Sequence, residues 1–179
     1  LIEHGADIEL KDRYGKTALM RSAKSGTEEV AAFLIDHGAN TNAEDNVGGT
    51  ALILAAQHGK LNVATLLIKH GANTNAKWVS GYTSIMLAAQ SGHKDVVNLL
   101  IEHVADVNSK TSSDVTALML AAENGFIDVV TLLIDHGADV NSQTVIGSSP
   151  LLLAVSNDRE DVAALLVEHG ADVNVMNKD

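Results

Sequence analysis

Six histidines recur along the chain, each 33 residues after the last, and histidine is a residue that can bind metal or transfer protons. They are His4, His37, His70, His103, His136 and His169. A zinc site would need several of these ring nitrogens about 2 Å from one ion. Units that recur once per period stack about 8–10 Å apart, so their rings do not converge. The spacing predicts no metal site, and each ring is expected to end a helix, where a partly positive imidazole suits the dipole.

Other catalytic arrangements are also missing. Asp36–His37 and Asp135–His136 resemble acid–base pairs, but adjacent residues of a helix do not face each other. The chain has no cysteine, which excludes a thiolate nucleophile, a thiolate metal site and a disulfide framework. Its glycines are spaced at recurring places in the period rather than forming a phosphate-binding loop. We therefore expect no enzyme activity and no cofactor.

The 33-residue period indicates that one small unit is repeated and stacked along a single array. We expect five full repeats and a partial repeat at each end, so that the chain is part of a longer array. The full repeats are 7–39, 40–72, 73–105, 106–138 and 139–171, and the partial ones are 1–6 and 172–179.

Each repeat contains the signals of a short helix followed by a longer one. A turn glycine is followed two residues later by Thr or Ser, which can cap a helix start. The capping residues are Thr17, Thr50, Thr83, Thr116 and Ser149, and Pro150 suits the first helical position. The short Ala-rich helix should end at the next glycine, as at Gly26 and Gly59.

The longer helix carries an apolar stripe at i, i+3 and i+4, such as Val63, Leu66 and Leu67. The same stripe recurs from Val30, Val96, Val129 and Val162. The helix should stop at His-Gly, and a polar, hairpin-like loop should lead to the next repeat. The fold class predicted is an all-α solenoid.

These motifs resemble those of ankyrin repeats over essentially the whole chain. The resemblance rests on Thr50-Ala-Leu-Ile, Thr116-Ala-Leu-Met and Ser149-Pro-Leu-Leu, and on the Gly-Ala-Asp-Val-Asn stretch that begins at Gly137. It implies a cupped shape in which short helices form a concave palm, hairpin loops form fingers and longer helices form the back. It also implies binding of another protein through palm and fingers, without catalysis.

Several positions depart from the family pattern. The histidine of the family's Thr-Pro-Leu-His motif is replaced by Met20, Ile53, Met86, Met119 and Leu152, so an apolar contact is expected there. Val104 stands where glycine normally ends the helix, Asp114 replaces a hairpin glycine, and Asp158 replaces an inter-helix glycine. A β-branched residue is strained at positive φ. The sequence therefore predicts either local strain at the junction around Val104 or a rerouted loop.

The charge balance restricts the class of partner. The chain has 12 Lys and Arg against 23 Asp and Glu, a net charge of −11. Nucleic acid and anionic membranes need clustered positive charge, so neither is expected as the partner. No apolar run is long enough to span a bilayer. The absence of cysteine suits a cytoplasmic location, with the nucleus as an alternative, and we expect a monomer.

We expect partner contacts at exposed positions of the fingers and short helices. The candidates are Arg13, Tyr14, Val47, His58, Trp78, Val79, Tyr82, Gln90, Glu123, Asn124, Val145 and Ile146. Exposed Trp and Tyr often dominate binding energy, so Trp78 and Tyr82 are the predicted anchors. The alternative is that Trp78 folds onto its own hairpin.

Charge is also uneven along this surface, with five basic residues between positions 11 and 24 and none between Lys110 and Arg159. This pattern fits a partner that is acidic at one end and basic at the other, or an ordinary solvated surface. The function predicted is protein binding. The alternatives are a structural spacer or scaffold segment and a regulatory arm of a larger protein.

Overall fold

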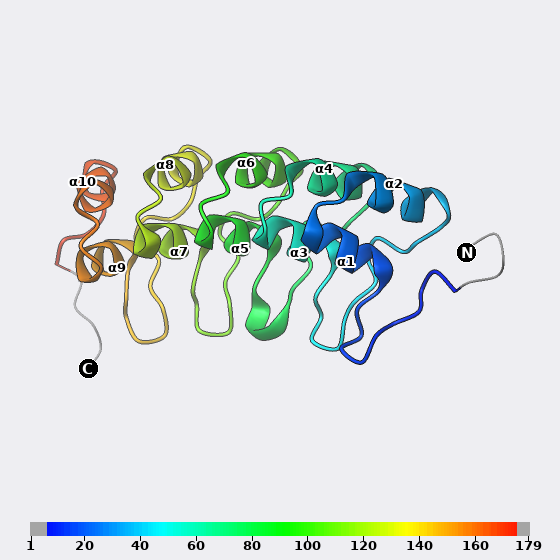
Figure 1. Ribbon diagram of the computed structural model, residues 1–179. Coiled ribbons are helices and arrows are strands. Elements are labelled where there is room, and N and C mark those ends of the chain that lie inside the picture. The colour runs from blue at the N-terminus through cyan, green and yellow to red at the C-terminus, as the bar shows by residue number, and fades with distance from the viewer. Residues whose placement is uncertain (1–6, 175–179) are drawn as a thin grey trace.

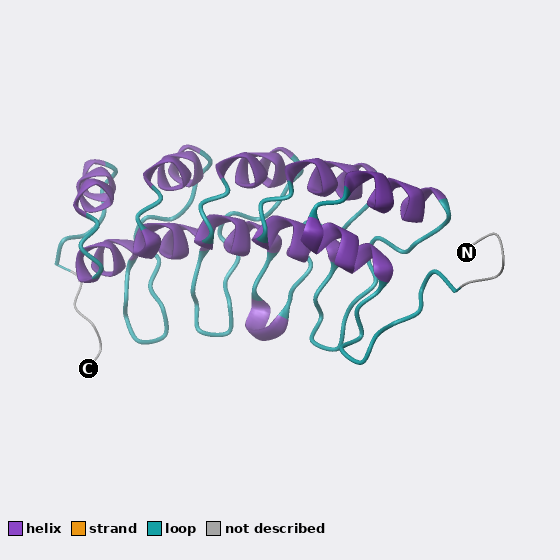
Figure 2. Cartoon of the chain, in the orientation of Figure 1, coloured by secondary structure: helices purple, strands orange, loops and turns teal. Residues whose placement is uncertain are grey.

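The computed structural model describes residues 7–174, which form five helix pairs stacked in one direction (Figure 1). The expected partial repeat 1–6 lies outside the described residues, as do the last five residues of the partial repeat 172–179. No strand occurs within residues 7–174 (Figure 2). The all-α solenoid predicted from the period is confirmed.

The helices lie in two layers, with long loops on the side of the inner layer away from the outer one (Figure 1). The inner layer contains α1 (Ala18–Ser25), α3 (Ala51–Gln57), α5 (Ser84–Gln90), α7 (Ala117–Asn124) and α9 (Pro150–Ser156). The outer layer contains α2 (Glu28–Asp36), α4 (Leu61–Lys69), α6 (Lys94–Glu102), α8 (Ile127–Asp135) and α10 (Glu160–Glu168).

The inner helices begin where a hydroxyl caps the first turn. Thr50 Oγ1 accepts a hydrogen bond from the Ile53 N–H at 3.3 Å, and Thr17, Thr116 and Ser149 cap in the same way. Pro150 is the first residue of α9, as predicted. The prediction for Thr83 is wrong, because its side chain makes no capping bond and its buried Oγ1 has no hydrogen-bond partner.

The core lies between neighbouring helix pairs rather than at one centre. Ala55, Ala56, Ala88 and Ala89 are fully buried, since small side chains let neighbouring inner helices approach closely. The residues that replace the family's histidine are also apolar and buried, with Leu152 half-buried at the end of the array. The buried ones are Met20, Ile53, Met86 and Met119.

The apolar stripe of the outer helices is buried in four of the five copies, through pairs such as Val63 and Leu67. In the first copy Val30 and Phe33 are each 49% exposed, and only Leu34 is buried. Their helix, α2, is the first outer helix of the described chain. No described outer helix therefore packs against its other side.

Five loop tips project from the inner layer, and we call them fingers 1 to 5. They comprise residues 12–16, 45–49, 78–82, 111–115 and 144–148. In each finger the N–H of the first residue donates to the carbonyl of the fifth, at 2.7–3.0 Å. We call the surface formed by the fingers and the adjoining side of the inner helices the palm.

Val104, Asp114 and Asp158 adopt the left-handed conformation normally left to glycine, with φ of 65°, 60° and 55°. The backbone beside Val104 is not rerouted. The Ala105 N–H donates to the Leu100 carbonyl at 3.0 Å, as the Ala72 N–H does to Leu67. Of the two outcomes predicted for this junction, the structure has the strained one.

Candidate functional site

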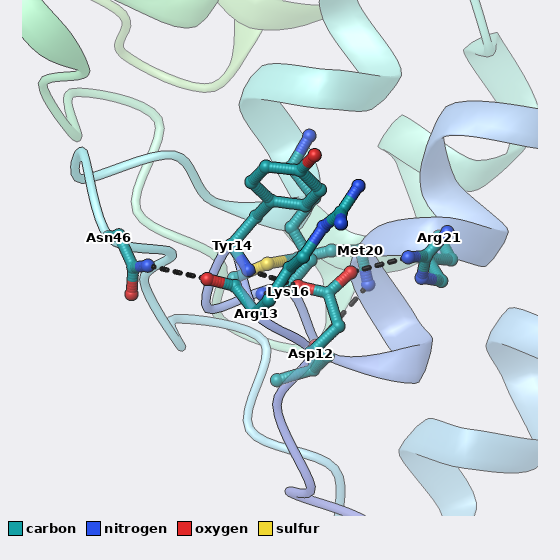
Figure 3. A network of polar contacts seen from close by, with 8 residues as sticks. Asp12, Arg13, Tyr14, Lys16, Met20, Arg21 and Asn46 are labelled. Carbon is teal, nitrogen blue, oxygen red and sulfur yellow. Dashed lines mark hydrogen bonds and ion pairs between the residues drawn. The ribbon is translucent and has the colours of Figure 1, made fainter.

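Finger 1 is built around the carboxylate of Asp12 (Figure 3). Asp12 Oδ1 accepts hydrogen bonds from the N–H groups of Tyr14 at 2.8 Å and Lys16 at 2.9 Å, while Oδ2 accepts from Arg21. The Lys16 N–H lowers the pKa of Asp12 below its ordinary value of 3.8. Partial desolvation opposes this shift, and the Tyr14 N–H and Arg21 add to it.

Finger 1 also presents an aromatic ring with a guanidinium group stacked beside it. The Arg13 Cζ lies 4.6 Å from the centre of the Tyr14 ring, and Tyr14 is 53% exposed. The Asn46 N–H donates to the Tyr14 carbonyl at 3.1 Å, and Asn46 Nδ2 donates to the Arg13 carbonyl at 3.2 Å. Finger 2 therefore holds the backbone that carries this pair of side chains.

Finger 3 differs from the others because Trp78 occupies the first position. Asp12, Asp45, Thr111 and Thr144 all use a side-chain oxygen there to accept N–H groups of their own finger. Tryptophan is a donor only. Residues Val79–Gly81 instead form a short 3-10 helix, with Ser80 at φ 59°.

The two predicted aromatic anchors are both half-buried. The Nε1 of Trp78 is buried and has no hydrogen-bond partner in the described residues, and Tyr82 packs against the core. Neither side chain is therefore fully exposed at the tip of its finger.

A groove of about 350 Å³ lies on the palm across fingers 3, 4 and 5. It brings together five predicted site residues, namely Tyr82, Gln90, Glu123, Val145 and Ile146. Val145 and Ile146 are exposed apolar side chains, at 56% and 62%. The groove is apolar along much of its wall, and Glu123 is its one charged lining residue.

Our choice of site residues missed six others that line this groove. They are Ser113, Val115, Leu120, Thr144, Ser148 and Leu153. A signal for several of them was present in the period, because Val115 and Ser148 stand 33 and 66 residues after Tyr82. Leu120 and Leu153 belong to the inner helices α7 and α9, at positions that border the palm.

The remaining seven predicted residues lie outside the groove. Arg13 and Tyr14 are on finger 1, Val47 is exposed on finger 2, and Trp78 and Val79 are on finger 3. His58 and Asn124 end inner helices. The His58 Nδ1–H donates to the Leu54 carbonyl at 3.0 Å, and Asn124 Nδ2 donates to the Leu120 carbonyl at 2.8 Å.

The periodic histidines cap the outer helices instead of gathering at one point. The Nδ1–H groups of four of them donate to the carbonyl four residues earlier, at 2.7–2.9 Å. They are His37, His70, His136 and His169. Within residues 7–174, no three His, Asp or Glu side chains are grouped as metal ligands would be.

Comparison with protein families gives three overlapping matches to the family described as ankyrin repeats (3 copies), at residues 1–78, 39–111 and 85–177. The chain belongs to the ankyrin-repeat family. Ankyrin repeats generally mediate protein–protein interactions and are generally not enzymes. A search of curated proteins finds no match. In the described part of this ankyrin array, every helix is too short to cross a lipid bilayer.

Proposed function

We propose that this ankyrin array is a non-catalytic module that binds another protein through its palm and fingers. The observation that carries the proposal is the groove across fingers 3 to 5, where Val145 and Ile146 stay exposed beside Tyr82 and Val115. Exposed apolar side chains around a hollow are typical of a surface that a partner covers.

The rigidity of the fingers supports the same proposal. The Ser112 N–H donates to the Ser80 carbonyl at 2.8 Å, and the Val145 N–H donates to the Ser113 carbonyl at 3.2 Å. Fingers 3, 4 and 5 are thus bonded tip to tip. A surface held in place before binding loses little conformational entropy when the partner arrives.

The twelve proposed contact residues have different roles, which follow from their surroundings. Val145 and Ile146 are the apolar anchors, Tyr82 forms a wall of the groove, and Trp78 supports the backbone of finger 3. Tyr14 and Val47 extend the contact surface toward finger 1.

Crosslinked pull-down from the cell that makes the chain would test the proposal. The chain would be compared with Val145→Ser/Ile146→Ser and with a matched control, Val30→Ser/Phe33→Ser, on outer helix α2. Both pairs are exposed apolar residues, so both variants should keep the parent's melting temperature.

We expect proteins captured by the parent to be lost from the palm variant and kept by the α2 variant. Equal capture by both would move the site away from the groove. Capture of nothing specific by the parent would favour the spacer or scaffold alternative. Capture of a linked catalytic domain would favour the regulatory arm.

Four further expectations belong to this proposal. We propose that the repeat boundaries are 7–39, 40–72, 73–105, 106–138 and 139–171, with partial repeats at 1–6 and 172–179. We also propose a monomer, a cytoplasmic or nuclear location, and a partner that is neither nucleic acid nor membrane. The net charge of −11 supports the last of these.

A further inference from the structure

The positions that line the groove of fingers 3 to 5 have equivalents in the first repeat, found by subtracting multiples of 33. Val145 corresponds to Arg13, and Ile146 corresponds to Tyr14. Tyr82, Val115 and Ser148 all correspond to Lys16. Leu120 and Leu153 correspond to Arg21, and Gln90 and Glu123 correspond to Lys24.

The same wall of the palm is therefore basic at one end and apolar at the other. Thr144, which also lines the groove, corresponds to Asp12, so four of the six equivalent positions in the first repeat hold Lys or Arg and the other two are Asp12 and Tyr14. In the second repeat only one equivalent position is charged, and that residue, Asp45, is buried and accepts N–H groups of its own finger. The other equivalents are Asn46, Val47, Gly49, Leu54 and Gln57. The change of character follows the stacking direction of the array (Figure 1).

The positive charge at the first repeat is only partly neutralised within the chain. Arg21 pairs with Asp12, but Arg13, Lys16 and Lys24 form no ion pair among the described residues. Arg13 lies over the Tyr14 ring, which leaves its guanidinium at the exposed tip of finger 1. Lys24 is exposed in the last turn of α1.

The apolar end carries the opposite charge. Glu123 is the only charged residue that lines the groove, and it is in no ion pair of the described chain. Arg159 bonds to the backbone of Glu123 rather than to its carboxylate, with Nε donating to the Glu123 carbonyl at 3.1 Å. The Glu123 carboxylate would repel an acidic side chain of a partner at the groove.

We propose that the palm binds an extended segment of a partner protein in one direction, with apolar side chains in the groove and acidic side chains over finger 1. This inference rests on the proposed function and adds the chemistry and polarity of the bound segment. Three to four repeats separate the two ends, at about 8–10 Å per packed helix. An extended chain rises about 3.3 Å per residue, so the segment spans about 7–12 residues.

Selection from a displayed library of random twelve-residue peptides, with the purified chain as bait, would test this. We expect enriched peptides to carry two or more acidic residues at one end and large apolar residues at the other. Arg13→Glu/Lys24→Glu should weaken these peptides at least tenfold, and Val145→Ser/Ile146→Ser should do the same. The matched charge control is Lys69→Glu/Lys94→Glu on outer helices, which should leave affinity within twofold.

Spacing gives a second readout. Moving the acidic residues of an enriched peptide to within three residues of its apolar group should cost at least tenfold in affinity. Equal affinity would overturn a segment that spans the palm. Melting curves of every variant would show that the fold is kept.

The outcomes separate this inference from the function on which it rests. One outcome is a set of peptides without acidic residues whose binding is lost with Val145→Ser/Ile146→Ser and unchanged with Arg13→Glu/Lys24→Glu. This result would overturn the proposed polarity of the segment but would still support binding at the palm. Enrichment of no peptide sensitive to any palm substitution would contradict both.

Discussion

Val104 shows how one residue can keep a strained conformation inside a regular array. Its φ is 65°, where the equivalent residues of the other described repeats are Gly38, Gly71, Gly137 and Gly170. Its side chain is 83% exposed, so it gains little burial in return. The neighbouring helix ends in the usual hydrogen bonds, which means that the array imposes the geometry on the valine.

Val104→Gly should therefore stabilise the chain by about 1 kcal/mol, because a residue with a Cβ in this conformation costs about 1–2 kcal/mol. Some of the gain is offset because glycine makes the unfolded chain more flexible. Thermal unfolding should show a rise of about 2–4 °C in Tm. Val104→Ala, which keeps a Cβ, should recover less, and a Tm that is unchanged or lower for Val104→Gly would contradict the strain.

Asp12 makes the stability of finger 1 depend on pH. Its pKa is lowered in the folded chain, first by the Lys16 N–H, and Tyr14 and Arg21 contribute as well. A group with a lowered folded pKa stabilises the fold above its ordinary pKa of 3.8, and that stabilisation is lost as pH falls through the folded pKa.

Asp12→Asn should thus lower the urea midpoint at pH 6, and the difference from the parent should shrink as pH falls toward 3. Arg21→Ala removes the ion pair but leaves the two backbone donors, so it should keep more of the pH dependence. A parent–variant difference that stays constant over this range would contradict the assignment, as would an Asp12 pKa at or above 3.8 by NMR titration.

At the scale of elements, the turn between the two helices of one pair packs against the equivalent turn of the preceding pair. A side chain at the start of each later outer helix covers the turn glycine of the preceding repeat, as Phe126 covers Gly92. A Cβ added at Gly92 would lie 2.7 Å from the Phe126 ring, and Gly92 has φ 72°. The glycine is needed both for its conformation and for the space it leaves.

Gly92→Ala should destabilise the chain by more than Gly137→Ala. Gly137 has a similar φ of 83° but no atom within 4 Å of its added Cβ, so it isolates the backbone cost of about 1–2 kcal/mol. The clash with a packed ring should add about 1–3 kcal/mol. Urea unfolding of the two variants, with Phe126→Ala in a double-mutant cycle, measures this coupling, and equal losses would mean that Phe126 simply moves aside.

The helix pairs, most of their caps and the glycine turns could be predicted from the sequence because each depends on local residue types repeated in phase. The features that differ from these regular patterns depend on contacts with neighbouring segments of the fold. Thr83 looks like Thr50 in sequence but makes no cap, and Val30 looks like Val63 but has no described helix to bury it.

The candidate groove was half predictable for the same reason. Exposed finger residues such as Val145 and Ile146 follow from repeat phase. The predicted anchor Trp78, however, was judged by residue type, without its place at the start of a finger. Since tryptophan cannot accept the N–H groups that aspartate or threonine accepts there, finger 3 rearranges and the ring becomes half-buried.

At the scale of the whole molecule, an asparagine ladder joins the repeats. Asn108 Nδ2 donates to the Gly137 carbonyl and Asn108 Oδ1 accepts from the Asp139 N–H, both at 2.9 Å. Asn42, Asn75 and Asn141 each make the same two bonds to the segment that follows the next helix pair. Because a stacked array has no central core, such links decide how far unfolding spreads.

Asn108→Ala should therefore do more than weaken one contact. Losing two hydrogen bonds costs about 1–3 kcal/mol, and Asn108 links the third helix pair to the fourth, near the middle of the described array. Urea unfolding followed by circular dichroism should show a lower midpoint and a smaller m-value, because the two parts no longer unfold together.

Asn141→Ala breaks the same bonds between the fourth and fifth pairs, where only the last described pair is released. It should lower the midpoint with less change in m. If both variants kept the parent's m-value, the ladder would stabilise each junction without coupling the repeats, and cooperativity would have to come from the packed alanines of the inner helices.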